Sequence, residues 1–118
     1  MRIRVWRIDG EEILQRLKAW AKELGNDPSV LAVILFGSFA RGEATPTSDA
    51  DVLIVLSESA LPFDERLVKY KPVGLGVSVE VFPYTLEEVV RGMREGWGMI
   101  LPAIREGIIL FKRESFSF

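Results

Sequence analysis

Two short apolar runs near the middle of the chain constrain its fold most. The run "VLAVILF" covers residues 30–36, and "DADVLIVL" covers residues 49–56 and is apolar on both sides after Asp51. Runs of this length that are rich in β-branched residues are typical of buried strands. Strands that are apolar on both sides lie in the interior of a sheet. The two segments are therefore expected to form the centre of one sheet.

The rest of the chain predicts helices around this sheet. A helix is expected from Asp9 to Gly25, because Asp9 and Glu12 fit a capping box and Gly25 suits a C-terminal cap. The alternating segment "GVSVEVF" predicts a third strand over 76–82 with a polar face. Further helices are expected over 63–71, from a Thr85 and Glu88 capping box to about 95, and onward to 106, followed by the strand "GIILFKR". The tail "ESFSF" reads as untied.

These elements predict one domain over residues 1–118, since 118 residues match the usual size of a single core. The expected fold class is α+β, in two layers, with a small mixed sheet and helices packed on one face. The chain has no cysteine and no histidine, so its chemistry must use carboxylates, hydroxyls, amides, Lys and Arg. A net charge of -2 argues against direct nucleic-acid binding.

The chain also predicts a cytoplasmic location without a membrane segment. Its longest apolar runs are far shorter than the roughly 18 to 20 residues that span a bilayer. The first nine residues lack the apolar region of a signal peptide.

Two aspartates begin the second central strand, and they are the first candidates for chemistry. Residues two apart on a strand share a face at a spacing of about 6.6 to 6.8 Å, so Asp49 and Asp51 point to the same side. Like charges this close raise each other's pKa unless a cation lies between them. Hard divalent ions such as Mg²⁺ prefer carboxylate oxygens, and a pair of them can activate an attacking oxygen and neutralise a departing one. Glu80, on the polar face of the third strand, is a candidate third ligand or general base.

A glycine and a serine precede this acidic pair. Gly37 allows a tight turn at the end of the first central strand, and Ser38 is expected to begin a short helix over 38–42 whose free N–H groups and hydroxyl hold phosphate oxygens. Simpler interpretations stay open for each residue. Ser38 fits an ordinary N-cap, the aspartates fit turn chemistry, Glu80 fits a solvent-facing position, and Arg41 fits a surface charge as well as a phosphate or partner contact.

The pattern "GS", ten residues, then "DAD" at the start of a strand resembles the signature of the nucleotidyltransferase superfamily that includes DNA polymerase beta. More narrowly, "GSFARGEATPTSDADVLIV" is similar to the minimal nucleotidyltransferase domains of prokaryotes. The matching positions are Gly37, Ser38, Ala40, Arg41, Gly42, Ser48, Asp49 and Asp51. The family's third acidic residue is usually Asp, and Glu80 occupies the corresponding strand here.

The resemblance implies a site and a partner. It implies Asp49, Asp51 and Glu80 as catalytic, metal-holding carboxylates for Mg²⁺ or Mn²⁺, with ATP as substrate. It also implies nucleotide contacts at Gly37, Ser38, Arg41 and Ser48. Family members of this size often pair with a small helical HEPN-type toxin, which they neutralise by binding it, by transferring AMP to its tyrosine, or by both.

Two other functions remain open at this point. One is a non-catalytic module that only masks the toxin, and the other is modification of a small molecule. The absence of a second domain to hold a small acceptor disfavours the latter. The sequence leaves open whether the chain forms a homo-oligomer.

Overall fold

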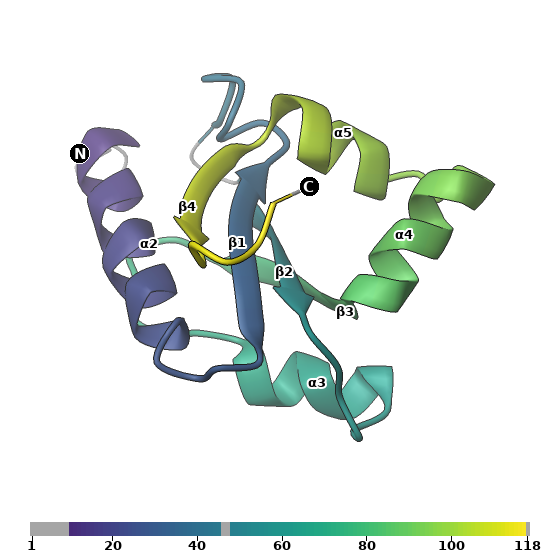
Figure 1. Cartoon of the computed structure of the whole chain (residues 1–118). Coiled ribbons are helices and arrows are strands. Elements are labelled where there is room, and N and C mark those ends of the chain that lie inside the picture. The colour runs from purple at the N-terminus through teal and green to yellow at the C-terminus, as the bar shows by residue number, and fades with distance from the viewer. Residues whose placement is uncertain (1–9, 46–47, 118) are drawn as a thin grey trace, which may run out of the picture.

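The computed structural model describes residues 10–45 and 48–117 (Figure 1). The predicted capping role of Asp9 lies outside these residues. The described elements are α2 (Gly10–Leu24), β1 (Val30–Phe36), β2 (Ala50–Leu56), α3 (Phe63–Tyr70), β3 (Val79–Thr85), α4 (Leu86–Glu95), α5 (Ile100–Glu106) and β4 (Ile108–Lys112). No helix within these ranges is long and apolar enough to cross a membrane.

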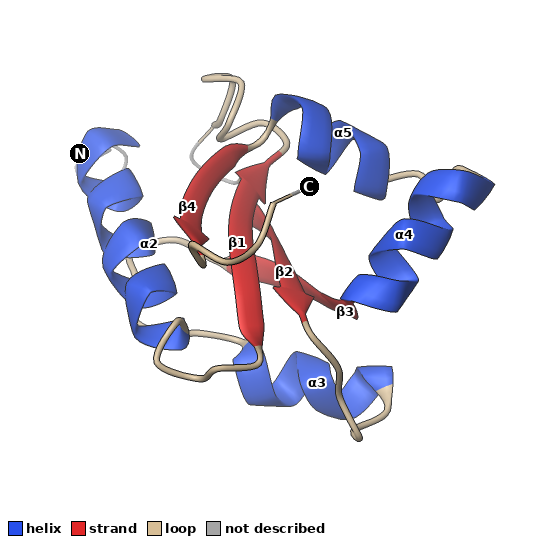
Figure 2. Cartoon of the chain, in the orientation of Figure 1, coloured by secondary structure: helices blue, strands red, loops and turns tan. Residues whose placement is uncertain are grey.

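The four strands form one mixed sheet in the order β3-β2-β1-β4 (Figure 2). The strand β1 runs antiparallel to both β2 and β4, while β2 and β3 are parallel. The two apolar runs therefore form the central strands, as the sequence predicts. The α+β class with a small mixed sheet is confirmed.

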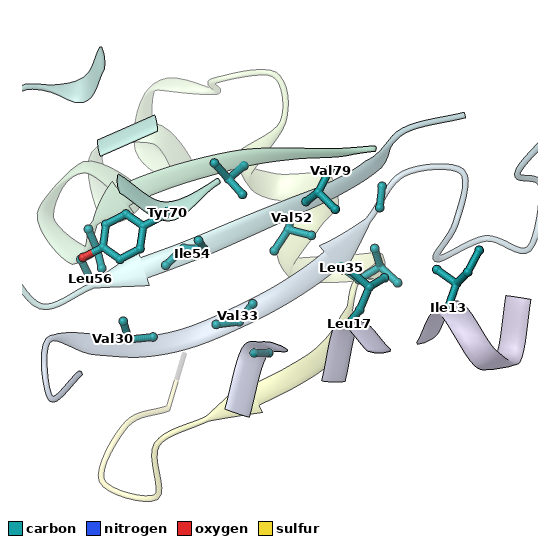
Figure 3. Close-up of a cluster of buried hydrophobic side chains, with 13 residues drawn as sticks. Ile13, Leu17, Val30, Val33, Leu35, Val52, Ile54, Leu56, Tyr70 and Val79 are labelled. Carbon is teal, nitrogen blue, oxygen red and sulfur yellow. The ribbon is translucent and has the colours of Figure 1, made fainter. Parts of the chain in front are cut away.

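Helices cover both faces of the sheet, which corrects the expectation of two layers with helices on one face. On one side, Ile13 and Leu17 of α2 pack with Val33, Leu35, Val52, Ile54 and Tyr70 (Figure 3). On the other side, Ile34, Leu53 and Val55 pack with Val89 of α4 and with Ile100 and Ala103 of α5. The reason is the composition of the central strands. Both strands carry apolar side chains on both of their faces, so each face of the sheet must be covered.

The third strand begins three residues later than expected and ends at Thr85. Gly74 and Gly76 have φ angles of +77° and +84°, a left-handed backbone that cannot continue a strand. The strand then extends through Pro83, which a sheet tolerates here because β3 lies at its edge. The predicted capping box of the following helix is confirmed. The Thr85 side chain accepts a hydrogen bond from the Glu88 N–H group, and the Glu88 side chain accepts one from the Thr85 N–H group.

The predicted C-terminal cap of α2 is confirmed, because Gly25 directly follows the helix and its N–H group donates to Ala21 O at 3.1 Å. A Cβ on Gly25 would clash with the Phe111 ring, so close packing against β4 also requires the glycine. The expectation for the C-terminal tail needs correction. The tail is anchored by Phe116, which is half-buried and packs against the hydrophobic core on the side of α4 and α5.

Candidate active site

Two carboxylates lie side by side at one end of the sheet. Asp51 is the second residue of β2, and it stands directly opposite Glu80 of the parallel strand β3. Neighbouring strands are about 4.8 Å apart, so the two side chains leave the sheet as adjacent groups. They share the face of Leu53 and Phe82, which belong to the core covered by α4 and α5. The structure thus brings together Asp51 and Glu80, which are 29 positions apart in the sequence.

Gly37 makes the space that the Asp51 carboxylate occupies. It directly follows Phe36, the β1 partner of Asp51, and its φ of +76° turns the chain out of the sheet. A Cβ at this position would lie 2.5 Å from Asp51 Oδ2, closer than real Cβ contacts. The glycine is therefore required twice, for the left-handed backbone and for the close approach of the carboxylate.

The segment that follows Gly37 is a turn rather than the expected helix over 38–42. Arg41 N donates to Gly37 O at 3.1 Å, Gly42 N to Phe39 O at 3.3 Å and Glu43 N to Ser38 O at 2.8 Å, and residues 37–42 form a turn without a helix. No described residue accepts a hydrogen bond from the N–H groups of Ser38, Phe39 or Ala40. Consecutive N–H groups in a turn form a concave anion-binding arrangement, so the candidate phosphate cradle is the turn itself.

Arg41 lies beside this turn in an exposed ion pair. Its Nε donates to Glu43 Oε1 at 2.9 Å, and the Glu43 hydrogen bond and charge raise the pKa of the Arg41 guanidinium. The charges of Glu106 and Asp51 act in the same direction, so Arg41 lies within the field of the acidic site. Such an exposed pair contributes little to stability, so the guanidinium is free to exchange Glu43 for another anion.

Ser48 supports the loop that leads into the aspartates. Its Oγ accepts a hydrogen bond from Thr45 N at 2.8 Å, and the two hydroxyls are 3.1 Å apart. Asp49 is exposed and precedes β2, whereas Asp51 is half-buried. The hydroxyl of Ser48 therefore has a structural contact that the sequence does not reveal.

The negative charges at this end of the sheet act on one another. Burial raises the pKa of the Asp51 carboxyl, and Glu80 and then Asp49 raise it further, while Arg41 lowers it. A site that penalises its own ionised carboxylate is suited to a cation. The fit to Mg²⁺ or Mn²⁺ rests on these hard oxygen donors, on the glycine that admits Asp51, and on the like-charge repulsion. Within residues 10–45 and 48–117, however, no group of three acidic side chains is positioned to hold one metal ion together.

Two contacts near the site are missed by sequence reasoning. One is Glu43, whose pairing with Arg41 depends on the turn geometry. The other is the aromatic pair of Phe36 and Phe82, whose ring centroids are 5.6 Å apart. A sequence signal exists for the second, because Phe36 precedes Gly37 and Phe82 lies two residues beyond Glu80 on the same face. These two rings form an apolar surface next to the carboxylates of Asp51 and Glu80.

Comparison with known proteins decides which family has this site. The model of the family described as "Nucleotidyltransferase domain" matches residues 14–90, which include β1, β2, the turn after Gly37 and Glu80. The chain belongs to the nucleotidyltransferase domain family. It is accordingly a nucleotidyltransferase, and the enzyme class predicted from the Gly-Ser and Asp-x-Asp pattern is confirmed.

Relatives of this nucleotidyltransferase extend the comparison. A protein of Methanocaldococcus jannaschii named "Putative protein adenylyltransferase" is 37% identical over 73 residues, which are 59% of this chain and 73% of that protein. A bifunctional uridylyltransferase/uridylyl-removing enzyme of Rhodospirillum rubrum is 36% identical over 76 residues, 62% of this chain but only 8% of that enzyme.

Two solved structures share the fold of the nucleotidyltransferase. One is described as a "putative nucleotidyltransferase" from Sulfolobus solfataricus; it has a TM-score of 0.62 and 22% identity, with 92% of this chain and 88% of that chain covered. The other is a toxin-antitoxin with AMP-PNP; it has a TM-score of 0.55 and 16% identity, with 86% and 75% covered. At these identities the likeness supports the fold.

Proposed function

We propose that this nucleotidyltransferase transfers AMP from ATP to a tyrosine of a small HEPN-type toxin and thereby acts as its antitoxin. The observation that carries the proposal is the in-register pair of Asp51 and Glu80, with Asp49 two residues before Asp51, beside the turn at Gly37. The relative named as a protein adenylyltransferase supports a protein acceptor. The toxin-antitoxin structure with AMP-PNP supports the adenine nucleotide and the partner class.

In the proposed reaction the tyrosine oxygen forms a bond to the α-phosphorus of ATP, the bond between the α- and β-phosphates breaks, and pyrophosphate leaves. Mg²⁺ or Mn²⁺ on the carboxylates of Asp49, Asp51 and Glu80 would neutralise the triphosphate and lower the pKa of the attacking hydroxyl. The N–H groups of Ser38 to Ala40 and the Ser38 hydroxyl hold phosphate oxygens, and Arg41 exchanges Glu43 for the triphosphate. The tyrosine proton passes to the Glu80 carboxylate if Glu80 is the base, and to solvent water if Glu80 is a ligand.

Transfer of labelled AMP tests the chemistry. The assay uses as acceptor a small HEPN-type partner that co-purifies with this chain. We expect Asp51→Asn, which is nearly isosteric, to leave the fold intact and to reduce transfer by at least about 10²-fold, or roughly 2.7 kcal/mol of transition-state stabilisation. Glu58→Gln is the matched control, since Glu58 is exposed beyond the opposite end of β2 and its loss leaves transfer unchanged.

Two outcomes would contradict the proposal in different ways. Absence of transfer by the wild-type chain, to that partner or to small acceptors, would refute the catalytic hypothesis. Loss of transfer in Asp51→Asn with full neutralisation of toxicity in cells would instead support masking by binding alone. Glu80→Gln distinguishes a functional Glu80 from a solvent-facing one. The rate of transfer falls in this variant only if the carboxylate is a metal ligand or a base.

Calorimetry with ATP tests the metal requirement separately. We expect weak binding in EDTA and stronger binding with Mg²⁺ or Mn²⁺, because a triphosphate adds negative charge to a site that already repels its own carboxylates. Ser38→Ala is expected to weaken binding by about 1 to 2 kcal/mol, the scale of a lost hydrogen bond to a charged group. Equal affinity with and without metal would show that the ion does not bridge protein and nucleotide.

A further inference from the structure

An apolar groove runs along α4 outside the candidate active site. It has a volume of about 690 Å³ and lies between α4 and the C-terminal tail; its lining residues include Leu86, Val90, Met93 and Arg94 on the helix and Phe116 on the tail. Val90 and Met93 are 45% and 40% exposed, although both are large apolar side chains. None of the residues assigned to nucleotide or metal contributes to this groove. Exposed apolar side chains that line a groove indicate a surface that another element covers.

The charged residues on α4 indicate which kind of partner binds in this groove. Glu87, Val90 and Arg94 follow one another at spacings of three and four residues, so they lie on one stripe, with the acid near the N-terminus and the base near the C-terminus. Neither Glu87 nor Arg94 forms an ion pair with another residue of the described ranges. Their neighbours on the helix are occupied differently, because Arg91 lies over the Trp97 ring and Glu95 accepts from the Trp97 indole.

An antiparallel copy of the same helix complements this stripe. When two α4 helices cross antiparallel with Val90 near the two-fold axis, the midpoint of positions 87 and 94 also lies at that axis. Glu87 of each chain then faces Arg94 of the other, and the two Val90 side chains meet near the axis between the two ion pairs. Interfaces with two-fold symmetry require such self-complementary surfaces. We propose that the chain forms a homodimer in which each α4 lies in the groove beside the α4 of the second copy.

The size of the surface predicts a weak dimer. The helix has 10 residues, a length of about 15 Å at 1.5 Å per residue. Contact through one such helix and three tail residues falls at the small end of protein interfaces, where association is weak and transient. We therefore expect dissociation on dilution, and exposed charge pairs that set the register more than the affinity.

Charge exchange tests the proposal without relying on activity. The mass of the full chain is followed by sedimentation over a range of concentrations at low salt. Wild type is expected to dimerise, and Glu87→Arg or Arg94→Glu alone is expected to weaken the dimer at least about tenfold, because like charges then face each other. The double variant Glu87→Arg/Arg94→Glu restores the dimer. Mixing the two single variants restores it as a heterodimer, since every facing pair is then opposite in sign.

The other outcomes overturn the proposal. A wild-type chain that stays monomeric at all concentrations shows that something else occupies the groove. A dimer that neither single exchange weakens lies on another surface, and a dimer that the double exchange does not restore is not two-fold about α4. Melting temperatures of the single variants check folding, because an arginine in the first turn of α4 opposes the helix dipole. Glu114→Arg, an exposed tail residue outside the groove lining, is the control for net charge.

Discussion

Gly37→Ala is the most informative single substitution, because one methyl group tests both the backbone and the site. With φ at +76°, an alanine pays about 1 to 2 kcal/mol for the left-handed conformation. Its Cβ would also lie 2.5 Å from Asp51 Oδ2, so the carboxylate must move. Forcing the Asp51 side chain from its rotamer costs about 0.5 to 1.5 kcal/mol more.

The same turn supplies a matched control in Gly42→Ala. Gly42 has a φ of +73°, and a Cβ there meets nothing within 4 Å. Both substitutions therefore carry similar backbone strain, and only Gly37→Ala displaces Asp51. We expect Gly37→Ala to reduce nucleotidyl transfer by about 10²-fold, and Gly42→Ala to leave the rate within about threefold, since positioning errors near 1 Å have costs of this size.

Chemical denaturation separates the steric part from the backbone part. In the background of Asp51→Ala the clash is absent, so Gly37→Ala should then cost no more stability than Gly42→Ala. The expected coupling between positions 37 and 51 is about 0.5 to 1.5 kcal/mol, well within what a double-mutant cycle resolves. Equal losses from Gly37→Ala and Gly42→Ala in the wild-type background, with transfer intact in both, would refute the reasoning.

Three further predictions concern stability, each measured by denaturant unfolding of the full chain. Arg66 is buried and donates to Leu61 O, Pro83 O and the half-buried Glu88, so Arg66→Met should lower the free energy of unfolding by about 2 to 4 kcal/mol, and a loss below 1 kcal/mol would be inconsistent with a buried guanidinium that holds these acceptors. Gly25→Ala should cost about 1 to 3 kcal/mol through its clash with the Phe111 ring, and Phe111→Leu in the same chain should recover part of it. Because folding raises the pKa of the Asp51 carboxyl, the folded state binds the carboxyl proton more tightly than the unfolded state does. The free energy of unfolding should therefore fall as the pH rises from the ordinary pKa of an aspartate through the raised pKa of Asp51, and Asp51→Asn should remove this part of the pH profile in metal-free protein.

The local patterns of the sequence determine most of the secondary structure. The runs at 30–36 and 52–56 are apolar at every position, so both of their faces must be buried, and the sheet places them as its two central strands. The Thr85 and Glu88 capping box acts within four residues, and for that reason the start of α4 is predicted correctly. The Gly-Ser and Asp-x-Asp spacing, also local, indicates the family.

Only the tertiary structure decides which groups share the site and which elements cover the sheet. Glu80 becomes a neighbour of Asp51 through the parallel register of β2 and β3, and no local pattern specifies that register. The need for glycine at position 37 includes a contact with a side chain 14 residues away. The helices divide between the two faces because each face of the central strands is apolar, and the connections after β3 and before β1 place α4, α5 and α2 on opposite sides. Contacts between distant segments are set by packing of the whole core, which a local pattern does not contain.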